Sequence, residues 1–304
     1  PKKIRNQIKK TINKNKIIEI SSREKAISKA IEDLNSGDIL LVAGKGHETY
    51  QEYAIKKNKF SDRKIIIKEI KNKNKKLFND WKINILNKNC NLTKINKKLL
   101  TNNVSINSKN IKKNDIFFGI KGPNKDGNNY ADEAISKGAA FCVVNNIKSK
   151  NRKKIKVQNT LKVLTDSAKA IRKISTAKFI SITGSSGKTS LKELLAFSLN
   201  KLSSTAFSKN SFNNKYGVPL SLMNLKKFHN FGIFEVGMDK AGEINNLTKI
   251  IQPEIAVITN ISYAHIKNFN NLSEIASAKA EIMNNILPGG TVVLNKDDKY
   301  FRFL

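Results

Sequence analysis

The sequence is poor in cysteine, proline, tryptophan and acidic side chains. Its two cysteines, Cys90 and Cys142, stand far apart, which excludes a disulfide framework or a cysteine-rich zinc site and fits a reducing cytoplasm. No apolar run approaches the roughly 18 residues that span a bilayer, and no apolar segment follows Pro1 as it would in a signal peptide. Because the first residue is not Met, we expect the natural start to lie elsewhere.

Acidic residues number 24 against 57 lysines and arginines, which gives a formal net charge of +33. A chain this basic can bind nucleic acid. The lysines, however, run through the whole chain among asparagine and isoleucine, and arginine, which forms bidentate contacts with bases and phosphates, is rare. We therefore interpret the charge mainly as a compositional bias, and an NTPase that acts on nucleic acid stays an alternative.

Apolar runs alternate with segments of helical periodicity along most of the chain. Early in the sequence we predict a helix over 22–34, a buried strand over 38–43 and a helix or strand–helix piece over 60–70, followed by a charged linker from Lys71. Further strands are predicted at 104–106, 115–120, 141–144, 179–182, 231–235, 255–259 and 291–294. Further helices are predicted at 129–138, 161–174, 191–202, 218–225, 241–250 and 272–287. This alternation predicts an α/β fold with mostly parallel sheets.

The segment from Phe179 to Ser190 carries the strongest functional signal. A β-prone run ends at Gly184, and Gly187, Lys188 and Thr189 come directly before an amphipathic stretch. Backbone N–H groups in a glycine turn at a helix N-terminus form an anion site, a lysine there neutralises β- and γ-phosphates, and a hydroxyl can bind Mg²⁺. The strict Walker A spacing fails, because Ile182 stands where the first glycine is expected. The segment nevertheless predicts binding of a nucleoside triphosphate.

Polar residues follow other predicted strands at the same edge of the sheet. Glu235 ends one strand, and Asn260 and His265 follow the next. Ligands of open parallel sheets bind at the carboxyl ends of the strands, so a carboxylate and an imidazole there could hold Mg²⁺ or a phosphate. By itself, Lys279 could equally be a solvated lysine of a helix, and Asn295-Lys-Asp-Asp298 a polar turn.

From Ile83 to the end, the motifs resemble those of the Mur ligases. The resemblance is carried by Ile182-Thr-Gly-Ser-Ser-Gly-Lys-Thr-Ser190, Lys209-Asn-Ser-Phe-Asn-Asn-Lys-Tyr-Gly-Val-Pro219, Phe234-Glu-Val-Gly237, Thr259-Asn-Ile-Ser-Tyr-Ala-His265, Ala278-Lys-Ala-Glu-Ile282 and Leu294-Asn-Lys-Asp-Asp298. Ser105-Ile-Asn-Ser-Lys109 and Gly119–Gly127 look like the family's uridine-nucleotide-binding domain. The usual Asp-Ser-Arg of that domain is Asn107-Ser-Lys109 here. A folate-type polyglutamate ligase, which has a similar ATP core, is a further alternative.

Residues 37–63 are similar to the C-terminal end of a different Mur ligase, the synthetase that adds the third residue of the peptide. This resemblance implies that Gly44 and Glu48 contact an incoming amino acid. We therefore expect a natural fusion of two ligases, truncated at both ends. The expected domains are a partial Rossmann-like C-terminal remnant at 1–75, a linker at 76–82, a UDP-sugar-binding domain at 83–177 and a P-loop ATP-binding domain at 178–304.

The resemblance implies an ATP- and Mg²⁺-dependent ligase of peptidoglycan synthesis that joins D-Ala-D-Ala to UDP-MurNAc-tripeptide through an acyl phosphate. It is expected to be cytoplasmic and monomeric, and able to bind ATP even if turnover is poor. The implied ATP-binding residues are Gly184, Ser185, Ser186, Gly187, Lys188, Thr189, Asn295 and Asp298. The implied metal ligands are Thr189, Glu235 and His265, with Lys279 carbamylated beside the second metal and counted with Lys188 and His265 as catalytic. The implied substrate-binding residues are Ser108, Asn213 and Asn214.

Overall fold

The computed structural model describes Gln7 and residues 17–34, 38–44, 48–53, 56–90, Leu99, 101–147, Ser149, 151–263 and 268–304. The chain divides into two compact units, Pro1–Lys76 and Leu77–Leu304. None of the described helices is long and apolar enough to cross a membrane.

The first unit contains helix α2 (Arg23–Asp33), the antiparallel strands β1 (Tyr50–Tyr53) and β2 (Lys56–Lys59), and the start of helix α3 (Asp62–Cys90). The Ser22 hydroxyl caps α2 by accepting a hydrogen bond from the Lys25 amide, and Ile27 and Ile31 of α2 pack against Ile65 of α3. The predicted helix over 22–34 is thereby confirmed. Residues 71–82, expected to contain the linker, lie inside α3.

The strand predicted over 38–43 is wrong, because these residues have no regular secondary structure. The Ile39 side chain is 95% exposed and the Leu41 side chain 86%. An apolar run forms a buried strand only when neighbouring strands pair with it, and the strand pairing described in this unit is the β1–β2 pair alone.

The second unit contains two parallel sheets. The smaller sheet has the order β3-β4-β5-β6. Its strands are β3 (Val104–Ser105), β4 (Ile116–Phe118), β5 (Phe141–Val144) and β6 (Lys154–Lys156). Helix α4 (Ala131–Ser136) packs on one face, and the end of α3 together with α5 (Thr160–Ile174) packs on the other. The short 3-10 helices η2 (Ser108–Asn110) and η3 (Gly127–Tyr130) lie beside it.

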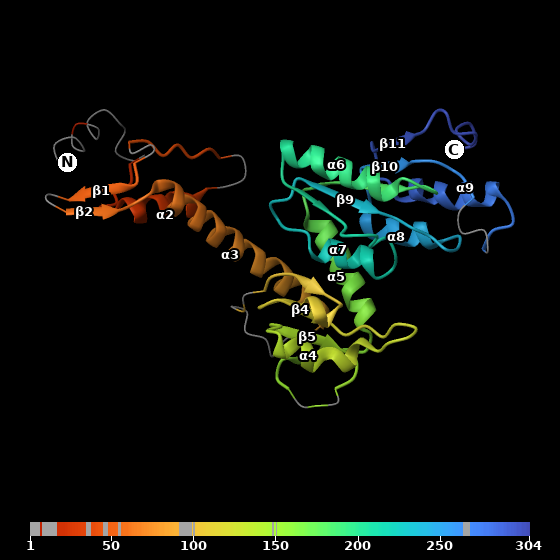
Figure 1. Cartoon of the computed structure of the whole chain (residues 1–304), viewed down its shortest axis with the longest axis horizontal. Helices are drawn as coiled ribbons and strands as arrows, with labels where there is room; N and C mark the ends of the chain where they lie inside the picture. Colours follow the sequence, from red (N-terminus) through yellow and green to blue (C-terminus); the bar gives the residue numbers. More distant parts are fainter. Residues whose placement is uncertain are drawn as a thin grey trace. The chain divides into compact units, whose positions relative to one another are not determined.

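The larger sheet has the order β11-β10-β7-β9-β8. Its strands are β7 (Lys178–Thr183), β8 (Thr205–Phe207), β9 (Phe231–Glu235), β10 (Ile255–Ile258) and β11 (Thr291–Leu294). Helix α6 (Lys188–Leu202) covers one face, where Ile180, Ile182 and Ile233 meet Ala196. Helices α7 (Gly217–Met223), α8 (Glu243–Ile251) and α9 (Leu272–Ala280) contribute to the core on the other face (Figure 1).

These two sheets confirm the mostly parallel α/β class. Apart from β6 and β8, every strand of the two sheets was predicted within two residues at each end, and the two missed strands have only three residues each. Helix α9 ends at Ala280 and continues as the 3-10 helix η5 (Glu281–Asn285), so the helix predicted to 287 is too long. At this point the Glu281 carboxylate accepts hydrogen bonds from the Gly242 and Asn245 amides at the start of α8.

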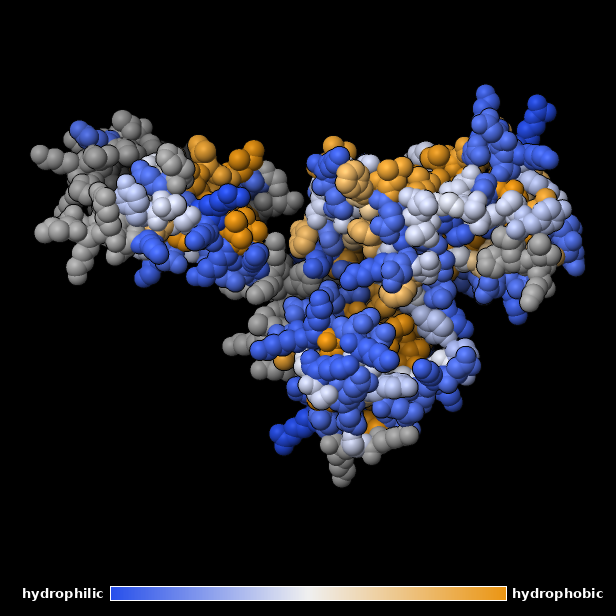
Figure 2. Space-filling model, viewed as in Figure 1, coloured by the Kyte–Doolittle hydropathy of each residue, from blue (hydrophilic) through white to orange (hydrophobic). Residues whose placement is uncertain are grey.

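Hydrophilic side chains cover most of the visible face of the second unit, and apolar side chains gather over α6 (Figure 2). Leu194, Phe197 and Leu202 of this helix are exposed. Its opposite face carries Ala196 and Lys192, which are buried against the sheet. Helix α6 therefore contributes one apolar face to the core and leaves another in solvent.

Candidate phosphate-binding site

The loop between β7 and α6 has a geometry that only glycine permits. Gly184 has a φ of +149°, and a Cβ built there would stand 1.8 Å from the Thr259 Oγ1 atom. Gly187 has a φ of +76° and lies directly before the first turn of α6. Left-handed backbone costs other residues about 1 to 2 kcal/mol. The two glycines therefore let the loop turn tightly into the N-terminus of α6, and a helix N-terminus is a place where backbone N–H groups can bind an anion.

The Lys188 side chain folds back over this loop. Its ammonium donates hydrogen bonds to the Gly184 carbonyl at 2.8 Å and to the Ser185 carbonyl at 3.4 Å. Burial lowers the pKa of Lys188, and the nearby charge of Glu235 opposes this effect. An anion in the loop would meet a cation that is already held at the turn.

The segment after β10 holds the loop from the side. The Asn260 amide side chain accepts from the Ser186 N–H at 2.9 Å and donates to the Ser186 hydroxyl at 2.7 Å. The Thr259 hydroxyl donates to the Ser186 carbonyl at 2.6 Å, and the Ser185 hydroxyl donates to the Ser262 carbonyl at 2.8 Å. These contacts arise because β10 pairs directly with β7. Asn260 was expected at this edge, whereas Thr259 and Ser262 were missed.

Glu235, at the end of β9, is the centre of a buried polar cluster. It is 1% exposed. One of its carboxylate oxygens accepts from the Thr189 hydroxyl at 2.8 Å, and the other accepts from the Asn213 amide at 2.9 Å. The Lys192 ammonium, also fully buried, lies 3.8 Å from the carboxylate. Lys192 was missed from the sequence, although its spacing of four residues from Lys188 puts both on one face of the helix.

The oxygen donors of this cluster fit a magnesium ion. A hydroxyl and a carboxylate are hard ligands, and Mg²⁺ is usually bound by one or two carboxylates together with waters and substrate phosphates. Among the described residues there is no group of three or more His, Cys, Asp or Glu side chains that could enclose a metal. Thr189 and Glu235 therefore suit a metal that shares its coordination with a bound phosphate.

Lys279 lies in the last turn of helix α9 and is buried, with 2% of its surface exposed. Burial is the main cause that lowers its pKa to about 8, and the charge of Lys188 lowers it further. The charge of Lys188 in the phosphate loop therefore acts on Lys279. The predicted His265 lies outside the described residues.

The remaining predicted residues are distributed over several places. Asp298 accepts a hydrogen bond from the Ile261 amide at 2.7 Å, beside the segment that holds the loop, and the Asn295 side chain accepts from the Asp297 amide. The Asn214 side chain accepts from the Gly217 amide at the start of α7. Asn213 alone of the predicted substrate residues touches Glu235.

Ser108 lies in the smaller sheet's part of the second unit. Its hydroxyl donates to the Glu133 carboxylate at 2.8 Å. It lines a cavity of about 450 Å³ at the carboxyl ends of β3 and β4, which Tyr216 also lines. Gly44, with a φ of +107°, and the exposed Glu48 belong to the first unit, where the Arg23 guanidinium donates to the Ala43 carbonyl and to Asp62.

Comparison with known protein families agrees with this geometry. Residues 101–179 match the catalytic domain of the Mur ligase family, and residues 182–304 match the Mur ligase middle domain. Over these residues the chain belongs to the Mur ligase family.

Several of the similar proteins carry the same name or its short form, MurF. The UDP-N-acetylmuramoyl-tripeptide–D-alanyl-D-alanine ligase of Rickettsia prowazekii is 40% identical over 202 residues, which are 66% of this chain and 45% of the relative. A crystal structure of MurF from Acinetobacter baumannii aligns with a TM-score of 0.65 at 29% identity and covers 72% of this chain and 49% of that one. The MurF ligase of Thermotoga maritima, solved in complex with ADP, aligns with a TM-score of 0.59 at 30% identity, over 68% of this chain and 48% of that one. The chain thus spans less than half the length of these relatives.

Proposed function

We propose that residues 101–304 form the nucleotide-handling part of an ATP-dependent ligase that joins D-Ala-D-Ala to UDP-MurNAc-tripeptide. The names of the similar proteins support the reaction, and the ADP complex of the Thermotoga maritima relative supports the nucleotide. These relatives favour peptidoglycan synthesis over the two alternatives, a nucleic-acid NTPase and a polyglutamate ligase. The boundaries at 83–177 and 178–304 are part of the proposal, as are a monomeric state and a cytoplasmic location.

The observation that carries the proposal is the 2.8 Å contact between Thr189 and Glu235 at the phosphate loop. It joins the first turn of α6 to the end of β9, beside a lysine that already covers the glycine turn. Phosphoryl transfer needs positioning and charge neutralisation more than covalent help from the protein. Lys188 and the loop amides would neutralise the β- and γ-phosphates, and Thr189 with Glu235 would hold Mg²⁺, which supplies further neutralisation when bound.

The reaction that we propose begins with attack of the peptide carboxylate on the γ-phosphate, which gives an acyl phosphate and ADP. The amine of D-Ala-D-Ala then displaces phosphate to form the amide. Asn213 would orient the Glu235 carboxylate, since its amide donates to the oxygen opposite Thr189. Gly237 permits this approach, because a Cβ there would stand 2.9 Å from the Asn213 side chain.

Lys279 and His265 would act on the acceptor side of the γ-phosphate. A buried lysine with a pKa near 8 has a sizeable neutral fraction near neutral pH, and its amine can then add CO₂ to form a carbamate and release a proton. That change would replace a cation that Lys188 repels with an anion suited to a second metal, which His265 would also bind. Asn295 and Asp298 would lie near the adenosine.

Ser108 and its cavity would receive the uridine part of the second substrate, with Asn213 and Asn214 nearer the peptide. The cavity volume of about 450 Å³ is in the range of small-molecule sites. For the first unit we keep the proposal of a Mur ligase C-terminal remnant with Gly44 and Glu48 at an amino-acid site. This proposal rests on the motif resemblance of residues 37–63 alone, because the family matches begin at residue 101.

Isothermal titration with Mg-ATP tests the nucleotide site. We expect the unmutated chain to bind, and Lys188→Ala to lose binding by roughly a hundredfold, about 2.7 kcal/mol. Lys201→Ala, an exposed lysine of the same helix, serves as the control and should bind normally. Absence of ATP binding in the folded, unmutated chain would refute the proposal.

A further inference from the structure

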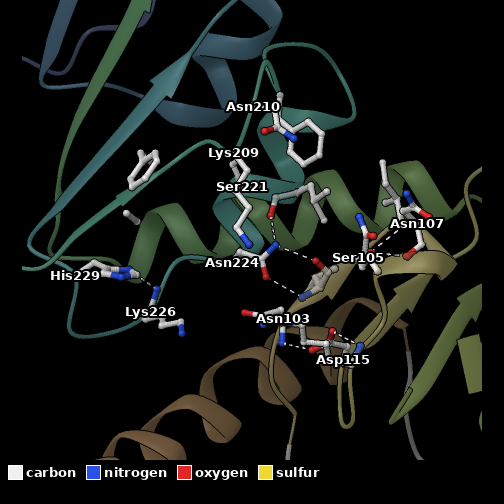
Figure 3. Close-up of a pocket in the computed structure, with 18 of the residues that line it drawn as sticks. Asn103, Ser105, Asn107, Asp115, Lys209, Asn210, Ser221, Asn224, Lys226 and His229 are labelled. Atoms are coloured by element: carbon white, nitrogen blue, oxygen red, sulfur yellow. Dashed lines mark hydrogen bonds between the residues drawn. The ribbon is translucent and has the colours of Figure 1, made fainter. Parts of the chain in front are cut away.

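A second cavity of about 520 Å³ lies beside the edge strand of each sheet in the second unit (Figure 3). One wall comes from β3 and the residues around it, and the other from β8, α7 and the segment before β9. Asn224 joins the two walls, because its side chain accepts from the Val104 amide at 2.8 Å and donates to the Val104 carbonyl at 2.9 Å. The cavity extends along β8 from Thr205 toward Lys209. The phosphate loop, in contrast, lies at the carboxyl end of β7.

The charged side chains that line this cavity are mostly positive. Three lysines, Lys112, Lys209 and Lys226, line it with a single carboxylate, Asp115. Asp115 already accepts hydrogen bonds from the Asn103 amide at 3.0 Å and the Lys112 amide at 2.9 Å. In the part of the chain that the structure describes, the Lys209 ammonium has no hydrogen-bond or ion-pair partner, and Figure 3 shows its side chain directed along the cavity toward Asn224.

The positive groups also repel one another. Burial lowers the pKa of Lys226, and the charge of Lys209 lowers it further. Behind the wall, the buried Lys82 has its pKa lowered to about 7 by burial and then by Lys226, with Asp115 opposing. His229 lines the cavity with a pKa lowered to about 4 by burial, Lys226 and Lys82, and its ring accepts a hydrogen bond from the Lys226 amide. A bound anion would relieve this repulsion.

Neutral hydrogen-bonding side chains form another part of the lining, beside apolar ones. They are the amides Asn103, Asn107, Asn110 and Asn210 and the hydroxyls Ser105, Ser221 and Thr205. Lysine ammonium groups bind phosphate as compact point charges, and the amides supply further donors. The three hydroxyls already donate to backbone carbonyls, those of Asn107, Gly217 and Ser203. The cavity is larger than a single ion needs, so it leaves room for a phosphorylated organic group.

We propose that this cavity binds a phosphate group between Lys209 and Lys226, separately from the phosphate loop. Ile106 and Asn107 line both this cavity and the one beside Ser108. The phosphate group therefore belongs either to free phosphate or to a nucleotide diphosphate seated in the neighbouring cavity. The second source rests on the proposed function, and the first does not.

Calorimetric titration with sulfate tests the site, because sulfate is a tetrahedral dianion that does not itself titrate near neutral pH. The phosphate loop contributes equally to every variant compared. We expect Lys226→Gln and Lys209→Gln to weaken sulfate binding at one site by roughly tenfold, about 1.4 kcal/mol. Lys227→Gln, an exposed lysine next to Lys226 that does not line the cavity, should leave binding unchanged. Lys209 is itself exposed, so its variant should fold normally if Lys226→Gln does not.

Proton uptake gives a second readout. Sulfate should raise the proton occupancy of Lys226 and Lys82. The heat of binding should therefore vary with the ionisation enthalpy of the buffer. Because the lysines lose protons as the pH rises, the affinity for sulfate should fall from about pH 6 to about pH 8. The other titratable side chains that line the cavity are Lys112, Lys209, His229 and Asp115, and none of them is substituted in this pH series. Equal sulfate affinity in Lys226→Gln, Lys209→Gln and Lys227→Gln would overturn the proposal.

Two further measurements locate the anion and identify its source. Crystals grown with selenate should give an anomalous peak between Lys209 and Lys226, and a peak at the phosphate loop alone would contradict the site. Titration with inorganic phosphate, UDP and uridine then separates the sources. If Lys226→Gln weakens UDP but not uridine, the nucleotide supplies the phosphate, and if it weakens inorganic phosphate alone, the free ion does. Lys188→Ala tests the proposed function independently, because Lys188 does not line this cavity.

Discussion

The two sheets of the second unit have parallel strands throughout, but their strand orders differ. In the smaller sheet the order β3-β4-β5-β6 follows the chain in one direction. In the larger sheet, β9 and β10 lie on opposite sides of β7, so the direction in which successive strands are added to the sheet reverses at β7. Loops diverge at such a switch point and leave a crevice where ligands bind.

This difference bears on the two anion sites that we propose. In the larger sheet, a glycine turn follows β7 at the switch point, the end of β9 supplies Glu235, and the loop after β10 supplies Asn260. The smaller sheet has no reversal, and its cavities lie beside η2 and the edge strand β3. The cavity of about 520 Å³ is lined by residues of β3 and of β8. Glycine geometry should therefore matter most at the first site, and lysine charge at the second.

The largest effect is expected from Gly184→Ala, which tests the backbone-built site. The added Cβ would overlap the Thr259 hydroxyl in a backbone conformation that alanine rarely adopts. We expect the free energy of unfolding to fall by about 3 kcal/mol or more, with loss of ATP binding. Chemical denaturation measures the first and calorimetry the second. Gly242→Ala is the control, since it also has a positive φ but meets no atom within 4 Å, and equal losses in both variants would contradict the steric explanation.

Glu235→Gln should keep the shape of the cluster and remove its charge. The Mg²⁺-dependent part of ATP affinity should weaken by up to roughly a hundredfold, because the carboxylate is the charged ligand in the proposed metal site. Titration with ATP in the presence and absence of Mg²⁺ measures this part. Glu193→Gln, which removes a half-exposed carboxylate near Lys192, provides the control. An unchanged magnesium effect in Glu235→Gln would remove Glu235 from the metal site.

Two buried lysines, Lys279 and Lys82, allow the two regions to be compared by the pH dependence of the free energy of unfolding. Lys279 has a pKa of about 8 in the folded chain against a reference of 10.5, so between these values the unfolded chain holds the extra proton. The free energy of unfolding therefore rises with pH in this window, and Lys279→Met should remove a rise on the order of 2 kcal/mol. Lys82→Met should remove a rise that begins earlier, near pH 7.

Denaturant unfolding followed from about pH 6 to about pH 10 measures both curves. Lys201→Met, at an exposed position, should leave the rise unchanged. If the unfolding free energy of Lys279→Met has the same pH dependence as that of Lys201→Met, then burial does not lower the pKa of Lys279.

The smallest effect is expected from Asn224→Ala, which tests the contact between the sheets. It removes two hydrogen bonds to the Val104 backbone and should cost about 1 kcal/mol of unfolding free energy. Hydrogen exchange at the Val104 amide should accelerate, while exchange in β7 should not. Unchanged protection of Val104 would mean that this bridge does not order the edge of β3.

Much of the larger sheet was predictable because its signals are local. The run from Phe179, the two glycines and the periodicity after Leu191 specify strand, turn and helix without distant contacts. The same reasoning gave a strand over 38–43 and failed, because an apolar run does not state whether a neighbouring strand will pair with it. It also missed β8, whose three residues pair with β9 but give too short a pattern to detect.

By itself the sequence determined the parallel α/β class, the glycine turn, and the candidate positions Lys188, Thr189 and Glu235. The tertiary structure alone decided the strand order, the buried Lys192 and Asn213 beside Glu235, the support of the loop by Thr259, and the cavity between Lys209 and Lys226. The physical reason is sequence separation. Turn and helix signals act over a few residues, whereas these contacts depend on which strands pair, and that choice is made by burying the whole core.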